Sequence, residues 1–192
     1  MMELRLGTMG PLTCAALALD QFALRNDLQA CKNLYPTFED VRAALLAREI
    51  DVALVPHCHP VSTEMLFNPL FHFDMESAFD RPNPELYLAS RPEEVRPLSE
   101  LMVCAGLPIV WPLVATDPRA AHAGLRLLPV PSNPAAAQAV VEGRADLAIT
   151  NAPSLDALGL KPVHVLKHVL LRWFPVRLAA VSTQPPCDSH AA

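Results

Sequence analysis

Short apolar runs alternate with longer amphipathic stretches along the first part of the chain. Strands are predicted at residues 4–6, 32–35 and 51–55, and helices at residues 12–25 and 37–48. Thr37 is placed to cap the second helix, and Asp40, three residues later, completes a capping box. Strands that alternate with helices in this way are typical of parallel pairing through helical crossovers.

This pattern is interrupted at residues 60–84, where aromatic residues mix with His, Asn and Pro. We interpret the segment as a loop and a strand that pass between two lobes. A second alternation follows, with strands predicted at 85–90, 98–104, 125–130, 146–150, 163–171 and 176–181, and helices at 107–115, 135–142 and 154–158. The predicted fold is α/β with two lobes, each a mostly parallel sheet flanked by helices, and a ligand cleft between them.

The borders of the lobes follow from this crossing. The first lobe is expected to contain residues 1–80 and about 165–183, and the second lobe about 81–164. Residues 184–192 are polar and small, and we expect them to form a frayed tail. Ligands of such sheets bind beyond the carboxyl ends of the strands, so the turns that follow the strands should face the cleft.

One local pattern occurs repeatedly: an apolar strand enters a tight turn, and a helix begins there. The junctions are residues 4–13, 102–108 and 127–134. They expose backbone N–H groups and the positive end of the helix dipole, which favour a carboxylate or phosphate. We expect substrate contacts there from Thr8, Met9, Gly10, Thr13, Gly106, Ser132 and Asn133. The alternative is that these residues only form tight turns and helix caps.

Composition narrows the class of protein. The 192 residues are 52% hydrophobic, enough for a substantial core. A net charge of −5 without a basic run argues against a nucleic-acid binder, and Pro or charge interrupts the longest apolar stretches, so no membrane span is expected. Five widely spaced cysteines, with no signal peptide ahead of Leu4, favour a cytoplasmic protein. The expected partner is a small anionic metabolite, and a homodimer is left open.

His57 directly follows the predicted strand that ends at Pro56, so it should lie at the mouth of the cleft. Its imidazole could supply a proton or pair with a carboxylate, and the alternative is a surface histidine. His59 is a candidate for substrate binding. Together with His72 these residues could form a metal site. Without an H-E-x-x-H motif or paired cysteines, however, we expect neither a metal nor a cofactor.

Four further side chains are candidates for substrate binding. Cys14 lies in the first turn of a predicted helix, where the dipole would stabilise a thiolate, and the alternative is a small buried residue. Thr150 and Asn151 end a predicted strand and should point into the cleft. Arg172 could form a bidentate pair with a substrate carboxylate, or could be a solvated charge on a strand.

Several segments, taken in order, carry a family resemblance. They are L-G-T-M-G-P-L-T at 6–13, F-E-D-V-R-A-A-L-L-A-R-E-I-D-V-A-L-V-P at 38–56, S-N-P-A-A-A at 132–137, A-I-T-N at 148–151 and L-G-L at 158–160. From about residue 4 to 175 the chain resembles the prephenate dehydratases, which implies the two-lobed type II periplasmic-binding-protein fold. That family has Ile-Glu-Asn-Ser where this chain has His-Cys-His-Pro at 57–60. Its Thr-Arg-Phe motif is absent, and Leu-Arg-Trp-Phe stands in that region at 171–174. These departures argue against ordinary dehydratase activity.

The same departures bring the chain nearer to the non-aromatizing prephenate decarboxylases of the bacilysin pathway. The shared features are L-Y-x-T-F-E at 34–39, V-P-H at 55–57, R-P-E at 91–93, T-N at 150–151 and Trp173. The resemblance implies a cofactor-free biosynthetic lyase that decarboxylates prephenate or a related small unsaturated dicarboxylate. We assign the proton donor to His57. An isomerase or dehydratase of a related acid, or a non-catalytic binding module for a small anion, stays open as an alternative.

Overall fold

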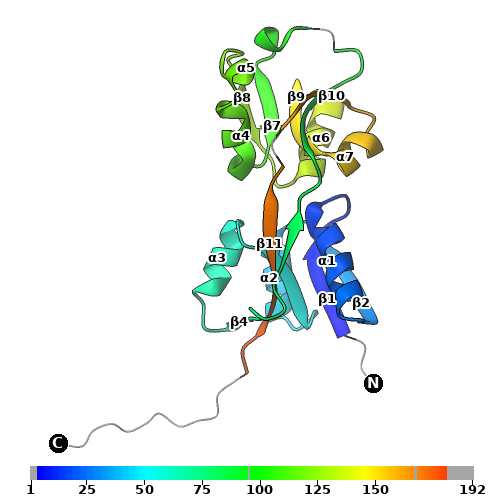
Figure 1. The fold of residues 1–192 in the computed structure, drawn as a ribbon, viewed down its shortest axis with the longest axis vertical. Coiled ribbons are helices and arrows are strands. Elements are labelled where there is room, and N and C mark those ends of the chain that lie inside the picture. The colour runs from blue at the N-terminus through cyan, green and yellow to red at the C-terminus, as the bar shows by residue number, and fades with distance from the viewer. Residues whose placement is uncertain (1–3, 95, 167, 181–192) are drawn as a thin grey trace, which may run out of the picture.

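The protein has two lobes stacked end to end, joined by two extended segments that cross a narrow waist (Figure 1). The computed structural model describes residues 4–94, 96–166 and 168–180. One crossing segment is β11 (Leu170–Leu178), drawn in orange, and the other, in green, leads from β5 (Phe79–Pro82) into β6 (Leu86–Ser90). The chain therefore leaves the first lobe once and returns to it once, as the predicted crossing requires.

The first lobe is built on a mixed sheet with strand order β2-β1-β3-β11-β4, in which β5 also pairs with β11. Its other elements are β1 (Leu4–Met9), β2 (Ala30–Tyr35), β3 (Val52–Pro56), β4 (Phe71–Phe73), α1 (Cys14–Arg25), α2 (Phe38–Leu46) and α3 (Pro60–Leu66). β1 is parallel to β2 and β3, as helical crossovers require, whereas β11 returns antiparallel to β3. Leu6, Leu54 and Trp173 are almost fully buried in its core.

Two of the helices that follow parallel strands of this lobe, α1 and α2, begin at hydroxyl caps. The Thr13 hydroxyl accepts the N–H of Ala16 at the start of α1. Thr37 and Asp40 form the predicted capping box at the start of α2. Each cap satisfies an N–H group that has no partner within the helix, so the position where each helix begins is set by local sequence.

The second lobe is built on a mixed sheet with strand order β10-β6-β9-β7-β8. Its other elements are β7 (Val103–Gly106), β8 (Arg126–Pro129), β9 (Leu147–Asn151), β10 (Lys161–Val165), α4 (Trp111–Ala115), α5 (Pro118–Ala121), α6 (Asn133–Val141), α7 (Ala152–Ala157) and 3-10 turns at Leu98–Glu100 and Pro108–Val110. β7 is parallel to β8 and β9, and β6 is antiparallel to β9 and β10. Ala136, Ala139 and Val140 of α6 are fully buried, because small side chains let this helix pack close to the sheet.

The structure differs from the predicted elements in the middle of the chain. The predicted loop contains the helix α3, because Pro60 suits a first helical turn and Val61 and Met65, four residues apart, bury one face. The predicted strand at 98–104 begins only at Val103, after a 3-10 turn. The predicted helix at 107–115 is a 3-10 turn followed by the short α4. Pro112 lies in the first turn of α4 and has no N–H to continue the hydrogen bonds of the preceding turn.

The end of the chain also differs from prediction. The predicted strand at 163–171 is divided between β10 and β11, and β11 continues through Pro175 to Leu178. The division between the sheets falls between β5 and β6 on the outward crossing, and between β10 and β11 on the return. The predicted tail at 184–192 lies outside the described residues. None of the helices that the structure describes is long and apolar enough to cross a lipid bilayer.

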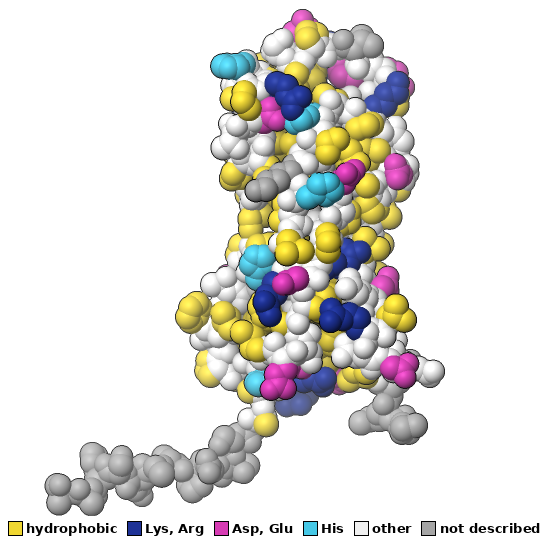
Figure 2. Space-filling view, in the orientation of Figure 1, with side chains coloured by type: hydrophobic (Ala, Val, Ile, Leu, Met, Phe, Trp, Pro, Cys, Tyr) yellow, Lys and Arg dark blue, Asp and Glu magenta, His cyan; other side chains and the backbone are white. Residues whose placement is uncertain are grey.

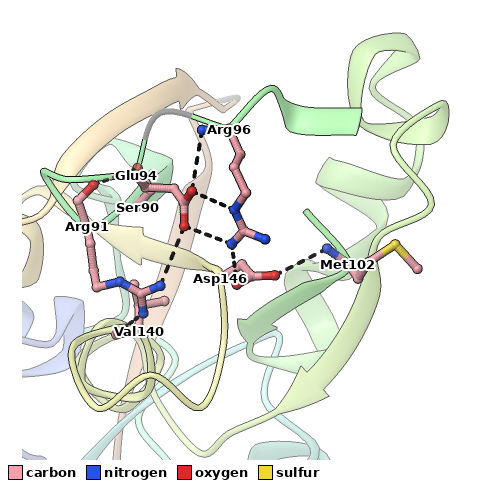
Figure 3. Close-up of polar contacts among 7 residues, drawn as sticks. All are labelled: Ser90, Arg91, Glu94, Arg96, Met102, Val140 and Asp146. Atoms are coloured by element: carbon pink, nitrogen blue, oxygen red, sulfur yellow. Dashed lines mark hydrogen bonds and ion pairs between the residues drawn. The ribbon is translucent and has the colours of Figure 1, made fainter. Parts of the chain in front are cut away.

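Charged side chains hold the loop that follows β6 (Figure 3). Arg96 donates to both carboxylate oxygens of Glu94, at 2.8 and 2.9 Å, and to Asp146 at 2.9 Å. These bonds from Arg96 lower the pKa of Glu94 to about 2. Arg91, part of the Arg-Pro motif, donates to the carbonyl of Val140 at 2.9 Å. Arg91 therefore packs this loop against α6, away from the waist.

Candidate active site

A cavity of about 280 Å³ lies between the lobes, and all three strand–helix junctions reach it. The first junction contributes Met9 and Cys14, the one after β7 contributes Ile109, and the one after β8 contributes Asn133. The wall also includes Leu86, Leu107, Leu113, Leu171 and Trp173. Figure 2 shows hydrophobic side chains around the waist between the lobes. The cavity therefore takes its walls from both lobes and from both crossing segments.

A larger and more open groove, of about 600 Å³, lies on the second lobe alone. Its polar groups already bind one another: Nε2 of His164 lies 2.7 Å from the carboxylate of Asp117, and Arg119 contacts both side chains. A groove whose polar groups are paired has little left to orient a ligand. We therefore place the candidate active site in the smaller cavity between the lobes.

The wall of the interlobe cavity is mostly apolar, and no Lys or Arg lines it within the part of the chain that the structure describes. Prolines also remove donors that the sequence pattern predicts at the helix starts. Pro108, Pro112 and Pro134 stand in the first turns after β7 and β8, and proline has no backbone N–H. The start of α1, where Cys14 and Ala15 keep their N–H groups, is therefore the best place for a carboxylate.

Two cysteines line the cavity from the first lobe. Burial is the main cause that raises the pKa of Cys14 to about 11, and the neighbouring Cys58 is the second cause. Burial also raises the pKa of Cys58. The dipole of α1 does not compensate for this loss of hydration, so both thiols are protonated at neutral pH. The structure thus favours the alternative for Cys14, in which it is a small buried residue of the cavity wall.

Two histidines line the same side of the cavity, and hydrogen bonds define their ring nitrogens. Nδ1 of His57 accepts the backbone N–H of Arg172 at 3.1 Å. Nδ1 of His59 accepts the N–H of Val61 at 3.3 Å and so caps α3. A neutral ring in either position carries its proton on Nε2. Burial lowers the pKa of His59, which keeps this ring neutral, whereas His57 is exposed at the edge of the cavity.

Two asparagine residues also line the cavity. Oδ1 of Asn133 and Oδ1 of Asn83 are buried without a hydrogen-bond partner among the described residues. Asn133 is a predicted site residue, but Asn83 is not. A signal for Asn83 exists in the sequence: it stands between Pro82 and Pro84 in the crossing segment, and a polar residue held by two prolines is unusual in a simple linker.

Four predicted site residues do not line the cavity, because their polar groups hold the turns together. The Thr8 hydroxyl donates to the carbonyl of Leu54 at 2.7 Å, and the Thr13 hydroxyl donates to the carbonyl of Gly10 at 2.7 Å while it caps α1. The N–H of Gly10 donates to the carbonyl of Tyr35 at 2.7 Å. Gly106 packs against Ile149, where a Cβ would come within 2.9 Å of that side chain.

Ser132 and Thr150 also have structural partners. The Ser132 hydroxyl accepts the N–H of Ala135 at 3.2 Å and caps α6. The Thr150 hydroxyl is fully buried and donates to the carbonyl of Asn133 at 2.9 Å. These bonds fix the first turn of α6, so both residues position Asn133 without lining the cavity themselves.

Asn151, predicted to point into the cleft, instead joins the two lobes. Its Nδ2 donates to the carbonyl of Leu12 at 2.9 Å, and its Oδ1 accepts the N–H of Ser154 at the start of α7. The Ser154 hydroxyl donates to the same Leu12 carbonyl at 3.4 Å. Leu12 has a φ of 63°, a left-handed conformation that turns its carbonyl out of the local helix pattern. These hydrogen bonds join the start of α7, in the second lobe, to the turn before α1, in the first lobe.

The side chain of Arg172 does not line the cavity. Successive side chains of a strand point to opposite faces, and its neighbours Leu171 and Trp173 occupy the inward positions of β11. The Arg172 guanidinium lies 4.0 Å from the carboxylate of Asp80, and both side chains are about half exposed. Arg172 contributes to the site through its backbone N–H, which binds His57.

The described residues include no cluster of three or more His, Cys, Asp or Glu side chains that could hold a metal ion. His72, considered as a ligand with His57 and His59, lies in β4 opposite Arg177.

The fold first defines a class, the two-lobed α/β proteins of the type II periplasmic-binding-protein-like fold. A prephenate dehydratase from Arthrobacter aurescens, solved with L-Phe, superposes with a TM-score of 0.65 at 18% identity, covering 92% of this chain and 61% of that chain. This protein thus spans about three fifths of that dehydratase. A periplasmic domain of BvgS from Bordetella pertussis superposes with a TM-score of 0.58 at 16% identity, covering 91% and 80% of the two chains.

Sequence comparison then gives a more particular relative. The chain is 27% identical over 174 residues to a prephenate decarboxylase from Planktothrix agardhii (strain NIVA-CYA 126/8), covering 87% of this chain and 84% of the relative. No family model matches the chain. The similarity to a prephenate decarboxylase and the fold shared with a prephenate dehydratase confirm the resemblance that the sequence motifs indicate.

Proposed function

We propose that this protein is a cofactor-free lyase that decarboxylates prephenate, or a related small unsaturated dicarboxylate, without making the ring aromatic. The observation that carries the proposal is the interlobe cavity. Its second-lobe wall is apolar apart from Asn133, whereas the first lobe supplies His57 and His59. A substrate there is enclosed by both lobes and separated from bulk water. The similarity to the Planktothrix agardhii prephenate decarboxylase supports this chemistry.

The two ends of the substrate need different surroundings. The side-chain carboxylate would bind at the start of α1, where the N–H groups of Cys14 and Ala15 have no partner within the helix. The ring and its own carboxylate would lie against the apolar wall that includes Leu107 and Leu113. A localised charge is poorly stabilised there, whereas a charge spread over a conjugated system suffers less, so the wall favours loss of CO2.

The reaction itself breaks one bond and uses one proton. The C–C bond between the ring and its carboxylate breaks and CO2 leaves. The electron pair spreads over the two separate ring double bonds, and a proton adds to the far carbon of one of them, which leaves a conjugated diene. The protein holds the carboxylate out of the plane of the ring and excludes water. His57 is our proton donor: it lies at the exposed edge of the cavity, and within the described residues no hydrogen bond engages its Nε2, so this nitrogen can exchange a proton with solvent.

A non-catalytic binding module is the second candidate. The thiols of Cys14 and Cys58 keep their protons and His59 caps α3, so among the described cavity residues His57 is the remaining candidate for proton transfer, and binding without turnover is the second interpretation. In that case the protein would bind the metabolite and release it unchanged.

The test is to incubate the purified protein with prephenate, follow the appearance of a conjugated-diene absorbance and trap CO2. We expect stoichiometric CO2, with turnover by His57→Gln lower by about 100- to 10,000-fold, because Gln keeps a hydrogen-bond donor but supplies no proton. His72→Gln, outside the cavity, is the matched control and should keep full turnover. Saturable binding without CO2 would replace the lyase with the binding module.

A further inference from the structure

One carbonyl group accepts the hydrogen bonds that join the two lobes away from the crossing segments. Among the described residues these bonds come from Nδ2 of Asn151 at 2.9 Å and from the hydroxyl of Ser154 at 3.4 Å, and both go to the carbonyl of Leu12. The donors stand at the start of α7, and the acceptor stands in the turn before α1. The two helices lie on the same side of the waist (Figure 1). The direction of a single peptide group therefore decides whether these bonds form.

Leu12 has an unusual backbone conformation. Its φ of 63° lies in the left-handed region, which is strained for a residue with a Cβ and favours Gly or Asn. A positive φ directly after Pro11 suits the third position of a type II turn, where Gly or Asn is again preferred. Burial of the side chain does not compensate for the strain, because Leu12 is 41% exposed. Such a residue persists only where its surroundings hold it, and the bonds from Asn151 and Ser154 are a restraint of this kind.

The turn that contains Leu12 is joined to the wall of the interlobe cavity. Met9 precedes the turn and Cys14 follows it, and both residues line the cavity. The Thr13 hydroxyl, next to Leu12, donates to the carbonyls of Met9 and Gly10 at 3.0 and 2.7 Å. These bonds tie the turn to the wall, so a rotation of the Leu12 peptide group also affects residues that a ligand in the cavity contacts.

We propose that Leu12 is a positioning residue that couples closure of the lobes to ligand binding. Its backbone takes up the strained conformation when the lobes close, and its carbonyl then accepts the bonds from Asn151 and Ser154. A ligand that contacts both walls of the cavity offsets the strain, whereas an empty cavity leaves it uncompensated, so the ligand-free lobes stay open more of the time. The inference rests on the proposed function only in naming prephenate as the ligand that closes the lobes.

The test changes the strain at position 12 and leaves the carbonyl in place. Leu12→Gly and Leu12→Asn adopt a positive φ more easily than the wild type, and Leu12→Val adopts it less easily because its side chain is β-branched. Small-angle scattering of the ligand-free intact chain should give a smaller radius of gyration for the Gly and Asn variants and a larger one for the Val variant. The KM for prephenate should fall by about 3- to 10-fold in the first two and rise by a similar factor in the third, while kcat stays within about 2-fold.

The same series in an Asn151→Asp background separates coupling between the lobes from a local effect on the turn. This variant keeps the cap on Ser154 but has no amide donor for the Leu12 carbonyl. If the strain acts through this contact, the substitutions at Leu12 should then change the KM by less than about 2-fold.

Arg48 is the matched control position. Its φ of 58° is also positive, but it follows α2, and its N–H donates to the carbonyl of Leu45 within the first lobe. Arg48→Gly should therefore change the unfolding free energy and leave both the KM and the radius of gyration as in the wild type.

Three results would overturn the inference: a radius of gyration that does not follow the series at Leu12, equal changes of KM in the Asn151→Asp background, or an equal change of KM in Arg48→Gly. The Gly and Asn variants are sufficient for the test if Leu12→Val does not fold. Failure of the proposed function gives a different result, in which prephenate is not converted but the radius of gyration of the ligand-free protein still follows the series.

Discussion

At the scale of single residues, Cys14 shows that burial can outweigh a helix dipole. It occupies the first position of α1, where a thiolate is favoured. Burial nevertheless raises its pKa to about 11, with Cys58 as a second cause, so the thiol keeps its proton. The sequence predicts the position in the helix correctly. It does not predict the burial, because the residues that cover Cys14 come from distant parts of the chain.

Cys14→Ala is expected to keep turnover within about 3-fold of the wild type and to lose roughly 1 kcal/mol of unfolding free energy, since only a small buried group is removed. Steady-state kinetics with prephenate and chemical denaturation check this. The exposed Cys31 provides the control variant Cys31→Ala, which should change neither quantity. A loss of turnover of about 1,000-fold with intact folding would make Cys14 a nucleophile after all.

His59 gives a prediction for pH. Burial lowers its pKa below the ordinary 6.5, so the unfolded chain takes up its proton at a higher pH than the folded protein does. The unfolding free energy therefore carries no penalty from His59 above about pH 6.5, and it decreases as the pH falls from there through the lowered pKa of the folded protein. His59→Asn keeps an acceptor for the Val61 N–H but does not titrate. Thermal unfolding between pH 7.5 and roughly 5 should therefore show a smaller decrease of Tm in the variant. Parallel Tm curves for the two proteins would rule this effect out.

At the scale of elements, local signals predict more than distant ones. The strand before Pro56 and the capping box of α2 depend on neighbours in sequence, and both are found. The helix α3 is missed, although Pro60 at its start and the spacing of Val61 and Met65 are visible in the sequence. The His, Asn and Pro residues of the segment 60–84 are more typical of a loop, and they led to the loop prediction. Its stability comes from packing against the sheet, which the sequence shows only indirectly.

The contact between α7 and the α1 turn gives a prediction at this scale. Asn151→Asp keeps the cap on Ser154 but loses the amide donor to the Leu12 carbonyl, so the lobes should separate more easily. We expect a KM about 5- to 10-fold higher and a larger radius of gyration in small-angle scattering. Ser154→Ala, which loses only the longer 3.4 Å bond, is the control and should stay near the wild type. An unchanged radius of gyration and KM in Asn151→Asp would show that this bond does not hold the lobes together.

At the scale of the whole molecule, the candidate site depends on the way the chain leaves one lobe and returns. Met9, Asn83, Asn133 and Trp173 stand far apart in sequence and line one cavity. The sequence predicts the two lobes, the cleft and the three junctions that meet there. The missing N–H groups of Pro108, Pro112 and Pro134 can be read from the sequence, although the predicted pattern of junctions overlooks them. That Asn83 lines the cavity cannot be read there, because it depends on how the lobes close on one another.

The account as a whole depends on loss of the ring carboxylate inside this cavity. The most direct measurement uses prephenate with an isotopic carbon label in that carboxylate, followed by NMR in the presence of the protein. We predict that the label passes completely into CO2 and bicarbonate, while the product keeps its hydroxyl-bearing ring carbon. A label that stays in intact prephenate, or the appearance of aromatic phenylpyruvate as the enzymatic product, would contradict the account.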